Sequence, residues 1–276
     1  MHPAGKAARE LITFYLEAGV DAVLGEEPID RFAGERMPQR APAIEQRPHS
    51  SSYKTGATAA FTADRARVTA TPPSSEAAVM AAREAARSAQ SLDELRTLLD
   101  AFEGCMLRAT ATQLVFADGN PQGRVMFVGE APGRDEDIAG LPFVGRSGKL
   151  LDLMMGAIGL DRTQVYIANV VPWRPPGNRT PTPQETAICL PFIRRQIELA
   201  DPDILVCLGQ PSTQTLLETK EGITKTRGRW FKFATGKRDI RAIATYHPAF
   251  LLRSPLQKRL AWRDFLALQK ALAQNG

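Results

Sequence analysis

The chain has 276 residues, of which 43% are hydrophobic and 24% are charged, and its formal net charge is +5. These values are typical of a globular protein of one or two domains, and the length is sufficient to bury a core. Three widely spaced cysteines exclude a disulfide framework and favour a reducing, cytoplasmic setting. No segment has the pattern of a transmembrane helix or a secretory signal, so we expect no membrane association.

The N-terminal part of the chain predicts helices separated by a polar segment. An amphipathic pattern at 6–24 predicts a helical segment within residues 1–33. Residues 34–75 are rich in Pro, Ser, Thr and Ala, and predict a disordered linker because they cannot bury enough apolar surface. A second helical region follows, in which Ser91 is a candidate N-cap. It leads into the main domain, so that the third part of the chain spans 76–276.

The remainder of the chain alternates short apolar runs with amphipathic helical patterns. Such runs, separated by helices, are typical of a parallel sheet covered on both faces. We therefore predict an α/β fold. The predicted strands are 124–130, 165–171, 204–209 and 240–247, and the predicted helices are 147–159, 183–199, 211–218 and 256–272.

Polar residues follow three of the four predicted strands. Glu130 comes directly after the first strand, Asn169 lies near the end of the second, and His247 ends the fourth. Ligands bind beyond the carboxyl ends of the strands in sheets of this kind. These three side chains, which are distant in the sequence, should therefore converge, and their convergence predicts a binding site.

Each candidate also has a structural interpretation that the residues alone leave open. Asn169 is either a satisfied edge residue or a donor and acceptor for a polar ligand such as a nucleobase. His247 is either structural or catalytic, and Phe143, in GLPFVGRSG, is either a packing aromatic or a platform on which a base stacks. The segment GEAPGRDED at 129–137 contains neither a dinucleotide fingerprint nor a P-loop, so nucleotide hydrolysis is not expected.

Positive charge gathers in one part of the sequence. Residues 224–259 contain ten Lys or Arg and one acidic residue, a net charge of +9 that exceeds the +5 of the whole chain. Such a segment is either a solvated surface or a phosphate-binding patch. The loop RPPGNR at 174–179 adds two arginines, and two leucines beside Arg253 either pack inward or wedge into a base stack. The candidates for nucleic-acid contact are Arg174, Arg179, Arg227, Arg229, Leu251, Leu252 and Arg253.

Four segments together resemble one family. GEAPGRDED, GLPFVGRSG, NVVPWRPPGNRTP and HPAFLLR, in this order, look like the motifs of family-4 uracil-DNA glycosylases. The resemblance covers about 102–272. It implies a three-layer α/β/α sandwich around a central, mainly parallel four-stranded sheet, here with a helical N-terminal extension. It also implies hydrolysis of the N-glycosidic bond of uracil in DNA, which leaves an abasic site and initiates base-excision repair.

The resemblance also assigns roles to the candidate residues. Phe143 stacks on a uracil extruded from the DNA, and Asn169 reads its Watson–Crick edge. His247 donates a hydrogen bond to the carbonyl oxygen of the departing base. Glu130 positions water or stabilises positive charge on the sugar. The expected catalytic residues are therefore Glu130, Asn169 and His247.

Two further positions belong to the expected uracil pocket. Glu136 matches the acidic residue that lines the pocket near the base. Ala131 stands where the best-known relatives have an aspartate, so the general base is not assigned and catalysis is expected to rest mainly on electrostatics.

One family feature is incomplete in this sequence. Family-4 enzymes typically hold a four-iron cluster on four cysteines, and the matching positions here are Phe102, Cys105, Trp173 and Cys189. A cluster with only two thiolate ligands is poorly held. We therefore predict no metal site and no cofactor, with the two aromatic side chains filling the space. Cys207 does not match the pattern.

The sequence thus predicts an enzyme that acts on DNA as a monomer. One alternative is a protein that binds uracil or abasic DNA without turnover or through a covalent bond. No histidine lies between 170 and 180, which argues against the covalent mode. A further alternative is a glycosylase of broader specificity for deaminated bases, including hypoxanthine.

Overall fold

The computed structural model describes residues 75–274. The helix predicted at 6–24 lies outside the described residues, and so does the linker predicted at 34–75 apart from its last residue, Ser75, which begins the first described helix. Within 75–274, no helix has the length and apolarity that crossing a membrane requires.

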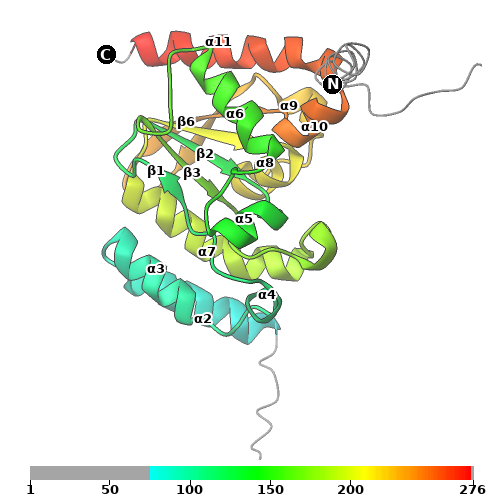
Figure 1. The fold of residues 1–276 in the computed structure, drawn as a ribbon. Coiled ribbons are helices and arrows are strands. Elements are labelled where there is room, and N and C mark those ends of the chain that lie inside the picture. Colours follow the sequence, from blue (N-terminus) through cyan, green and yellow to red (C-terminus); the bar gives the residue numbers. More distant parts are fainter. Residues whose placement is uncertain (1–74, 275–276) are drawn as a thin grey trace, which may run out of the picture. The chain divides into compact units, whose positions relative to one another are not determined.

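A single mixed sheet forms the centre of the described part of the chain (Figure 1). Its strand order is β1-β3-β2-β4-β6-β5. Strands β2, β3, β4 and β6 run parallel, and β1 and β5 lie antiparallel at the two edges. The predicted four-stranded parallel core is confirmed. The strands are β1 Asp118–Gly119, β2 Val125–Gly129, β3 Val165–Asn169, β4 Ile204–Leu208, β5 Trp230–Ala234 and β6 Asp239–Thr245.

The two edge strands were not predicted from the sequence. Strand β1 has two residues, which is too short to give an apolar run. Strand β5, WFKFA, is half-exposed with one buried residue, Phe233, so it lacks the continuous apolar character of the central strands. Edge strands are exposed in this way because one side of the strand has no neighbour.

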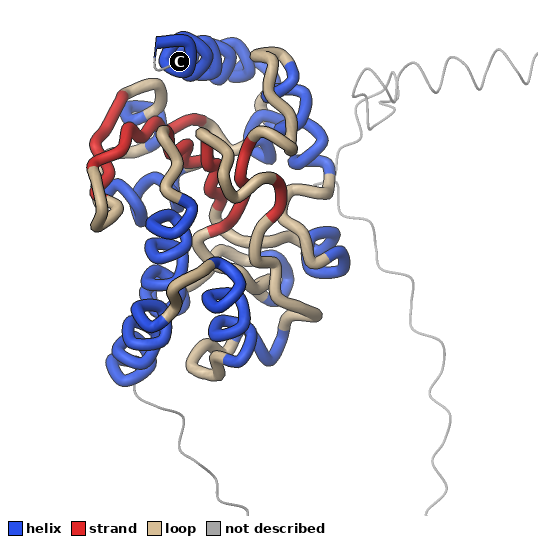
Figure 2. Tube along the Cα trace, turned by 90° about the vertical axis from the view of Figure 1, so that its left-hand side faces the viewer, coloured by secondary structure: helices blue, strands red, loops and turns tan. Residues whose placement is uncertain are grey.

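Helices cover both faces of the sheet, so the α/β/α sandwich is confirmed (Figures 1 and 2). Alternate residues of a strand point to opposite faces. Met126 and Val128 accordingly pack in one buried cluster with α7 and α8, whereas Val125 and Phe127 pack in another with α6 and α11. The longer helices are α2 Ser75–Ser88, α3 Leu92–Ala101, α6 Arg146–Gly156, α7 Pro183–Ala200, α8 Gln210–Leu217 and α11 Lys258–Gln274; the shorter ones are α4 Leu107–Thr110, α5 Arg134–Ala139, α9 Ile223–Thr226 and α10 Pro248–Arg253.

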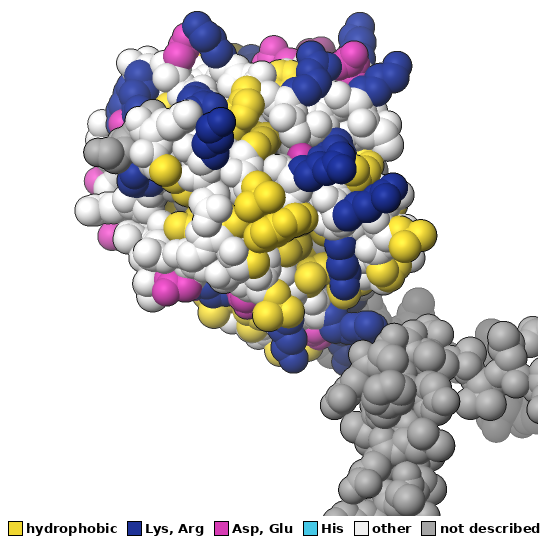
Figure 3. Space-filling view, turned by 90° about the horizontal axis from the view of Figure 1, so that it is seen from above, with side chains coloured by type: hydrophobic (Ala, Val, Ile, Leu, Met, Phe, Trp, Pro, Cys, Tyr) yellow, Lys and Arg dark blue, Asp and Glu magenta, His cyan; other side chains and the backbone are white. Residues whose placement is uncertain are grey.

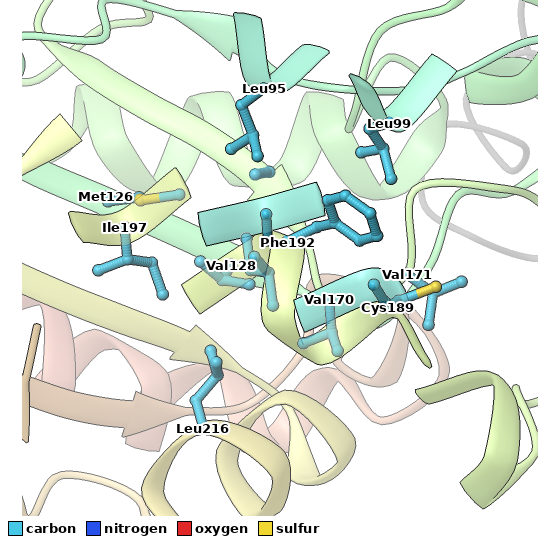
Figure 4. Packing of buried hydrophobic residues seen from close by; sticks show 14 of the residues in the cluster. Leu95, Leu99, Met126, Val128, Val170, Val171, Cys189, Phe192, Ile197 and Leu216 are labelled. Atoms are coloured by element: carbon cyan, nitrogen blue, oxygen red, sulfur yellow. The ribbon is translucent and has the colours of Figure 1, made fainter. Parts of the chain in front are cut away.

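The helical region before the sheet packs against α7. It is divided at Ser91, whose side chain accepts a hydrogen bond from the Glu94 N–H at 3.1 Å, so the predicted N-cap is confirmed. Leu95 and Leu99 of α3 belong to the same buried cluster as Phe192 of α7 (Figure 4). These helices therefore add a layer outside α7.

Parallel pairing brings four strand ends to one edge of the sheet. Gly129 at the end of β2 is paired with Asn169 at the end of β3, and Leu208 of β4 is paired with Thr245 of β6. The loops that follow these strands consequently lie together, and they carry the residues described next.

Candidate functional site

A cavity of about 580 Å³ lies beyond the carboxyl ends of the parallel strands. Loops after β2, β3, β4 and β6 line it, together with the loop before α6 and the start of α10. The convergence expected from the sequence is therefore present. Predicted site residues that line the cavity are Glu130, Ala131, Glu136, Phe143, Asn169, Arg179, His247 and Arg253.

The absence of a side chain at Gly129 makes room at the base of the cavity. A Cβ there would overlap Asn169 Oδ1 and would lie 2.7 Å from Phe143 Cζ, so glycine is required for these two side chains to take their positions. Asn169 is only 5% exposed, yet its amide makes no hydrogen bond to the described chain. Since a buried amide normally has partners, this one is available to a ligand.

Phe143 has an uncommon backbone conformation. Its φ is 55°, in the left-handed region that residues with a Cβ rarely adopt. A Cβ on Gly148 would overlap the Phe143 carbonyl oxygen, so Gly148 permits this turn at the start of α6. The Phe143 ring lies 5.5 Å from the His247 ring at an interplanar angle of 32°. The aromatic ring therefore forms one side of the cavity, next to the imidazole.

His247 is held as a neutral hydrogen-bond donor. It is the N-cap of α10, and its Nδ1 accepts a hydrogen bond from the Ala249 N–H at 3.1 Å. The ring proton is therefore carried by Nε2. Burial, with a smaller effect from the charge of Arg253, lowers the pKa of His247 to about 4. A neutral imidazole can donate to a developing negative charge without first being charged itself.

Glu130 supplies a half-buried carboxyl group to the cavity. Its Oε1 has no hydrogen-bond partner among the described residues. Burial raises the pKa of Glu130, and a hydrogen bond from Thr180 opposes this effect. A buried acceptor without a partner is costly, so this oxygen is suited to bind a water or substrate group.

Glu136 organises two loops that line the cavity. One carboxylate oxygen accepts the Gly133 N–H at 3.1 Å, and the other accepts the Val144 and Gly145 N–H groups at 3.1 and 3.0 Å. These bonds tie the loop after β2 to the loop that carries Phe143. The carboxylate thus already has partners, and its contact with uracil stays a prediction.

Two of the residues predicted to contact nucleic acid are held by contacts within the protein. The Arg227 guanidinium is bonded to the buried Asp264 carboxylate and to the Leu260 carbonyl. Leu251 is fully buried in the cluster with Tyr246, so it packs inward. Local charge and apolarity did not reveal the ion-pair partner of Arg227 on α11 or the inward face of α10 that carries Leu251. Contact of these two residues with nucleic acid stays a prediction.

The remaining arginine candidates differ in whether their side chains already have hydrogen-bond or ion-pair partners within the protein. Arg179 forms two hydrogen bonds with Glu185, at 2.7 and 2.8 Å, and Arg174 donates to Asn178 at 2.6 Å. Arg229 is paired with Glu221. Arg253 is exposed at the cavity and has no hydrogen bond or ion pair within residues 75–274. It is therefore the arginine best placed to meet a phosphate.

The basic segment does not form one continuous patch. Arg238, next to the β5–β6 turn, binds Asp201 and Asp203 at the opposite end of the sheet. On the face seen from above α11, separate Lys and Arg side chains surround an area of apolar side chains, and they do not form one continuous basic surface (Figure 3). Leu252, half-buried beside Arg253, keeps its predicted nucleic-acid contact as a proposal.

The four positions that match a cluster site form part of the hydrophobic core. Phe102 packs edge-on against Phe192, with ring centroids 5.1 Å apart, and Trp173 is 2% exposed. Cys105 and Cys189 are buried, and the interaction between their thiols lowers the pKa of Cys105 and raises that of Cys189. Among the described residues, no group of three His, Cys, Asp or Glu could hold a metal ion. Two thiols and two packed aromatic rings do not fit a four-iron cluster.

Some residues that shape the site were missed by sequence reasoning. Arg162 contacts the backbone at Phe143, and Asp137 is buried and accepts two hydrogen bonds from Thr112. Gly209 has φ 89°, and a Cβ there would lie 2.9 Å from the His247 Cβ. Gly209, which ends the third predicted strand, was a usable signal, whereas the partners of Arg162 and Asp137 are far away in the sequence.

Comparison with known proteins agrees with the family resemblance of the four sequence motifs. The family model described as "Uracil DNA glycosylase superfamily" matches residues 116–266. A type-4 uracil-DNA glycosylase of Archaeoglobus fulgidus is 39% identical over 180 residues, which are 64% of this chain and 90% of that protein. A type-4 uracil-DNA glycosylase of Thermotoga maritima is 45% identical over 151 residues, 54% of this chain and 77% of that protein. A type-5 uracil-DNA glycosylase of Pyrobaculum aerophilum is 31% identical over 133 residues, 48% of this chain and 55% of that protein.

Iron and acid-labile sulfide analysis tests the cluster positions. Because only two thiols are present among packed aromatic groups, we expect neither element in stoichiometric amount when the protein is purified without oxygen. Finding about four irons per chain, with the matching visible absorption, would contradict this expectation.

The pH titration of His247 tests its neutral state. Since burial lowers its pKa to about 4 from the ordinary histidine value of 6.5, the imidazole NMR signals of His247 should be unchanged between pH 8 and about 5.5. The unfolded chain binds this proton at a higher pH than the folded chain. Stability should therefore decrease as the pH falls from 6.5 towards 4. A titration midpoint near 6.5, identified with a His247→Gln variant, would show that the ring is not held neutral.

Proposed function

Because this chain belongs to the uracil DNA glycosylase superfamily, we propose that it is a uracil-DNA glycosylase. It hydrolyses the N-glycosidic bond of uracil in DNA, leaves an abasic site and so initiates base-excision repair. The observation that carries this proposal is the meeting of Asn169, Phe143, His247 and Glu130 in one cavity. Each of these four side chains has a different part in the reaction.

Recognition of the base requires extrusion of the nucleotide into the cavity. The Phe143 ring stacks on the uracil, and the unpartnered Asn169 amide pairs with its imide edge. Uracil presents an N–H flanked by carbonyls, whereas cytosine presents an amine and a bare ring nitrogen. The fixed amide therefore pairs with uracil and leaves unpaired groups against cytosine, which is the basis of strong discrimination.

Cleavage separates charge between the base and the sugar. The bond between C1′ and N1 breaks with its electron pair on the uracil, and His247 Nε2–H donates to the carbonyl oxygen on which negative charge develops. Water adds to C1′, and the Glu130 carboxylate orients this water and receives its proton. Burial raises the pKa of Glu130, which makes the ionised carboxylate a better acceptor of that proton.

The DNA partner binds across the mouth of the cavity. Arg253 is exposed at that mouth, and Arg174, Arg179 and Arg229 are further candidates for phosphate contacts. We propose that the active unit is a monomer, since Asn169, Phe143, His247 and Glu130 together supply the proposed base recognition and cleavage within a single fold. The three free thiols of the described chain favour a reducing, cytoplasmic setting.

Asn169→Ala and His247→Ala test the proposed chemistry. Each removes a polar contact made at the reacting base, so uracil release from a uracil-containing oligonucleotide should fall by about 100-fold or more. Abasic sites are cleaved with alkali and the products are measured on a denaturing gel. Asn120→Ala, in the turn before β2, is a matched control and should retain wild-type activity.

The same assay separates the alternative functions. A wild-type chain that releases no uracil, or that remains attached to the DNA on the denaturing gel, would replace the proposed function by non-turnover or covalent binding. Faster release of hypoxanthine than of uracil from matched oligonucleotides would establish broader deaminated-base specificity.

A further inference from the structure

We propose that Arg162 is a positioning residue that fixes the stacking ring of Phe143 and thereby sets the affinity of the cavity for the base. This inference rests on the proposed function, since it concerns the same cavity. Arg162 lies between α6 and β3, outside the four motifs that carry the family resemblance. It does not itself line the cavity.

The Arg162 guanidinium binds two consecutive backbone carbonyls. Nη1 donates to the Pro142 carbonyl at 3.3 Å, and Nη2 donates to the Phe143 carbonyl. The planar group thereby contacts the peptide carbonyls on the N-terminal and C-terminal sides of the Phe143 Cα. A lysine has one point-like donor group and cannot reproduce this fork.

Two carboxylates hold the guanidinium in place. Nε donates to Asp152 Oδ1 of α6 at 2.8 Å, and Nη1 is also paired with Asp118 of β1. The Arg162 side chain is 25% exposed, so these ion pairs are partly shielded from water. Arg162 thus joins the edge of the sheet, helix α6 and the loop that carries Phe143.

The Phe143 backbone needs external support because of its conformation. A left-handed φ of 55° is strained for a residue with a Cβ. Gly148 leaves space for the carbonyl oxygen but offers it no donor side chain. The two hydrogen bonds from Arg162 are charge-assisted, and bonds of this kind are the stronger ones. They therefore offset the cost of the turn.

The position of this backbone determines where the ring lies. The Phe143 ring is closely packed over Gly129 and lies beside His247. Rotation of the backbone out of the left-handed region would move the ring away from both. The ring surface on which the base stacks would then be lost from the cavity. The surface proposed to contact DNA phosphates would remain.

A second arginine provides a matched control. Arg238 also binds two carboxylates, of Asp201 and Asp203, and two consecutive carbonyls, of Asp201 and Pro202. Asp201 also has a positive φ, of 45°. These contacts of Arg238 lie at the β5–β6 turn, at the end of the sheet opposite the cavity.

The test measures base binding separately from DNA binding. Inhibition of the wild-type chain and of Arg162→Lys by free uracil gives the affinity of the base pocket, and binding of an abasic oligonucleotide gives the affinity of the DNA surface. We expect the uracil inhibition constant to rise about tenfold in Arg162→Lys, as loss of a stacking contact predicts, with abasic DNA bound as by the wild type. Arg162→Lys and Arg238→Lys should lower the melting temperature of the protein by similar amounts. Only Arg162→Lys should raise the inhibition constant; Arg238→Lys should leave it unchanged.

Two additional measurements make the result decisive. Arg162→Ala should recover uracil affinity on addition of guanidinium ion at a non-denaturing concentration, but not on addition of sodium chloride. Asp152→Asn removes a half-exposed carboxylate and should give a smaller rise in the same constant. An unchanged inhibition constant in both Arg162→Lys and Asp152→Asn, in chains that release uracil, would overturn the role of Arg162. A wild-type chain that releases no uracil would instead overturn the proposed function.

Discussion

The close approach of β2 and β3 at their carboxyl ends is the contact on which the site depends. Gly129 is paired with Asn169, and the missing side chain of Gly129 leaves the space that the Asn169 amide and the Phe143 ring occupy. The other loops of the cavity are arranged around this point. Glu136 joins the loop after β2 to the loop that carries Phe143, and His247 follows β6. The parallel sheet thus brings residues that are distant in the sequence together in one cavity.

Burial gives the polar groups of the cavity their chemical properties. Nδ1 of His247 is bonded to the backbone, and burial keeps the ring neutral, so Nε2–H is a fixed donor. Burial also raises the pKa of Glu130, whose Oε1 has no partner. One group is therefore suited to stabilise negative charge on a leaving base, and the other to accept a proton from water. The neutral state of His247 and the raised pKa of Glu130 both arise because solvent is excluded from these groups at the edge of the sheet.

Strand ends could be predicted from the sequence because buried parallel strands are continuous apolar runs. This is why the sequence alone predicts that Glu130, Asn169 and His247 lie together, as they do in the cavity. Contacts made by side chains over long sequence separations could not be predicted. Arg227 has its partner Asp264 on α11, and the inward face of Leu251 depends on the packing of α10. The support of Phe143 by Arg162 is of the same kind, and so is the packing of Phe102 against Phe192.

The Asn169 side-chain amide provides the most direct test of this account. Its two amide protons can be identified in NMR spectra of labelled protein by comparison with an Asn169→Ala variant, and followed while free uracil and then cytosine are added. The account predicts that uracil shifts the Asn169 amide signals with saturation and that cytosine leaves them unchanged at the same concentration. Uracil binding that shifts other signals but leaves those of Asn169 in place, or equal shifts with cytosine, would contradict it.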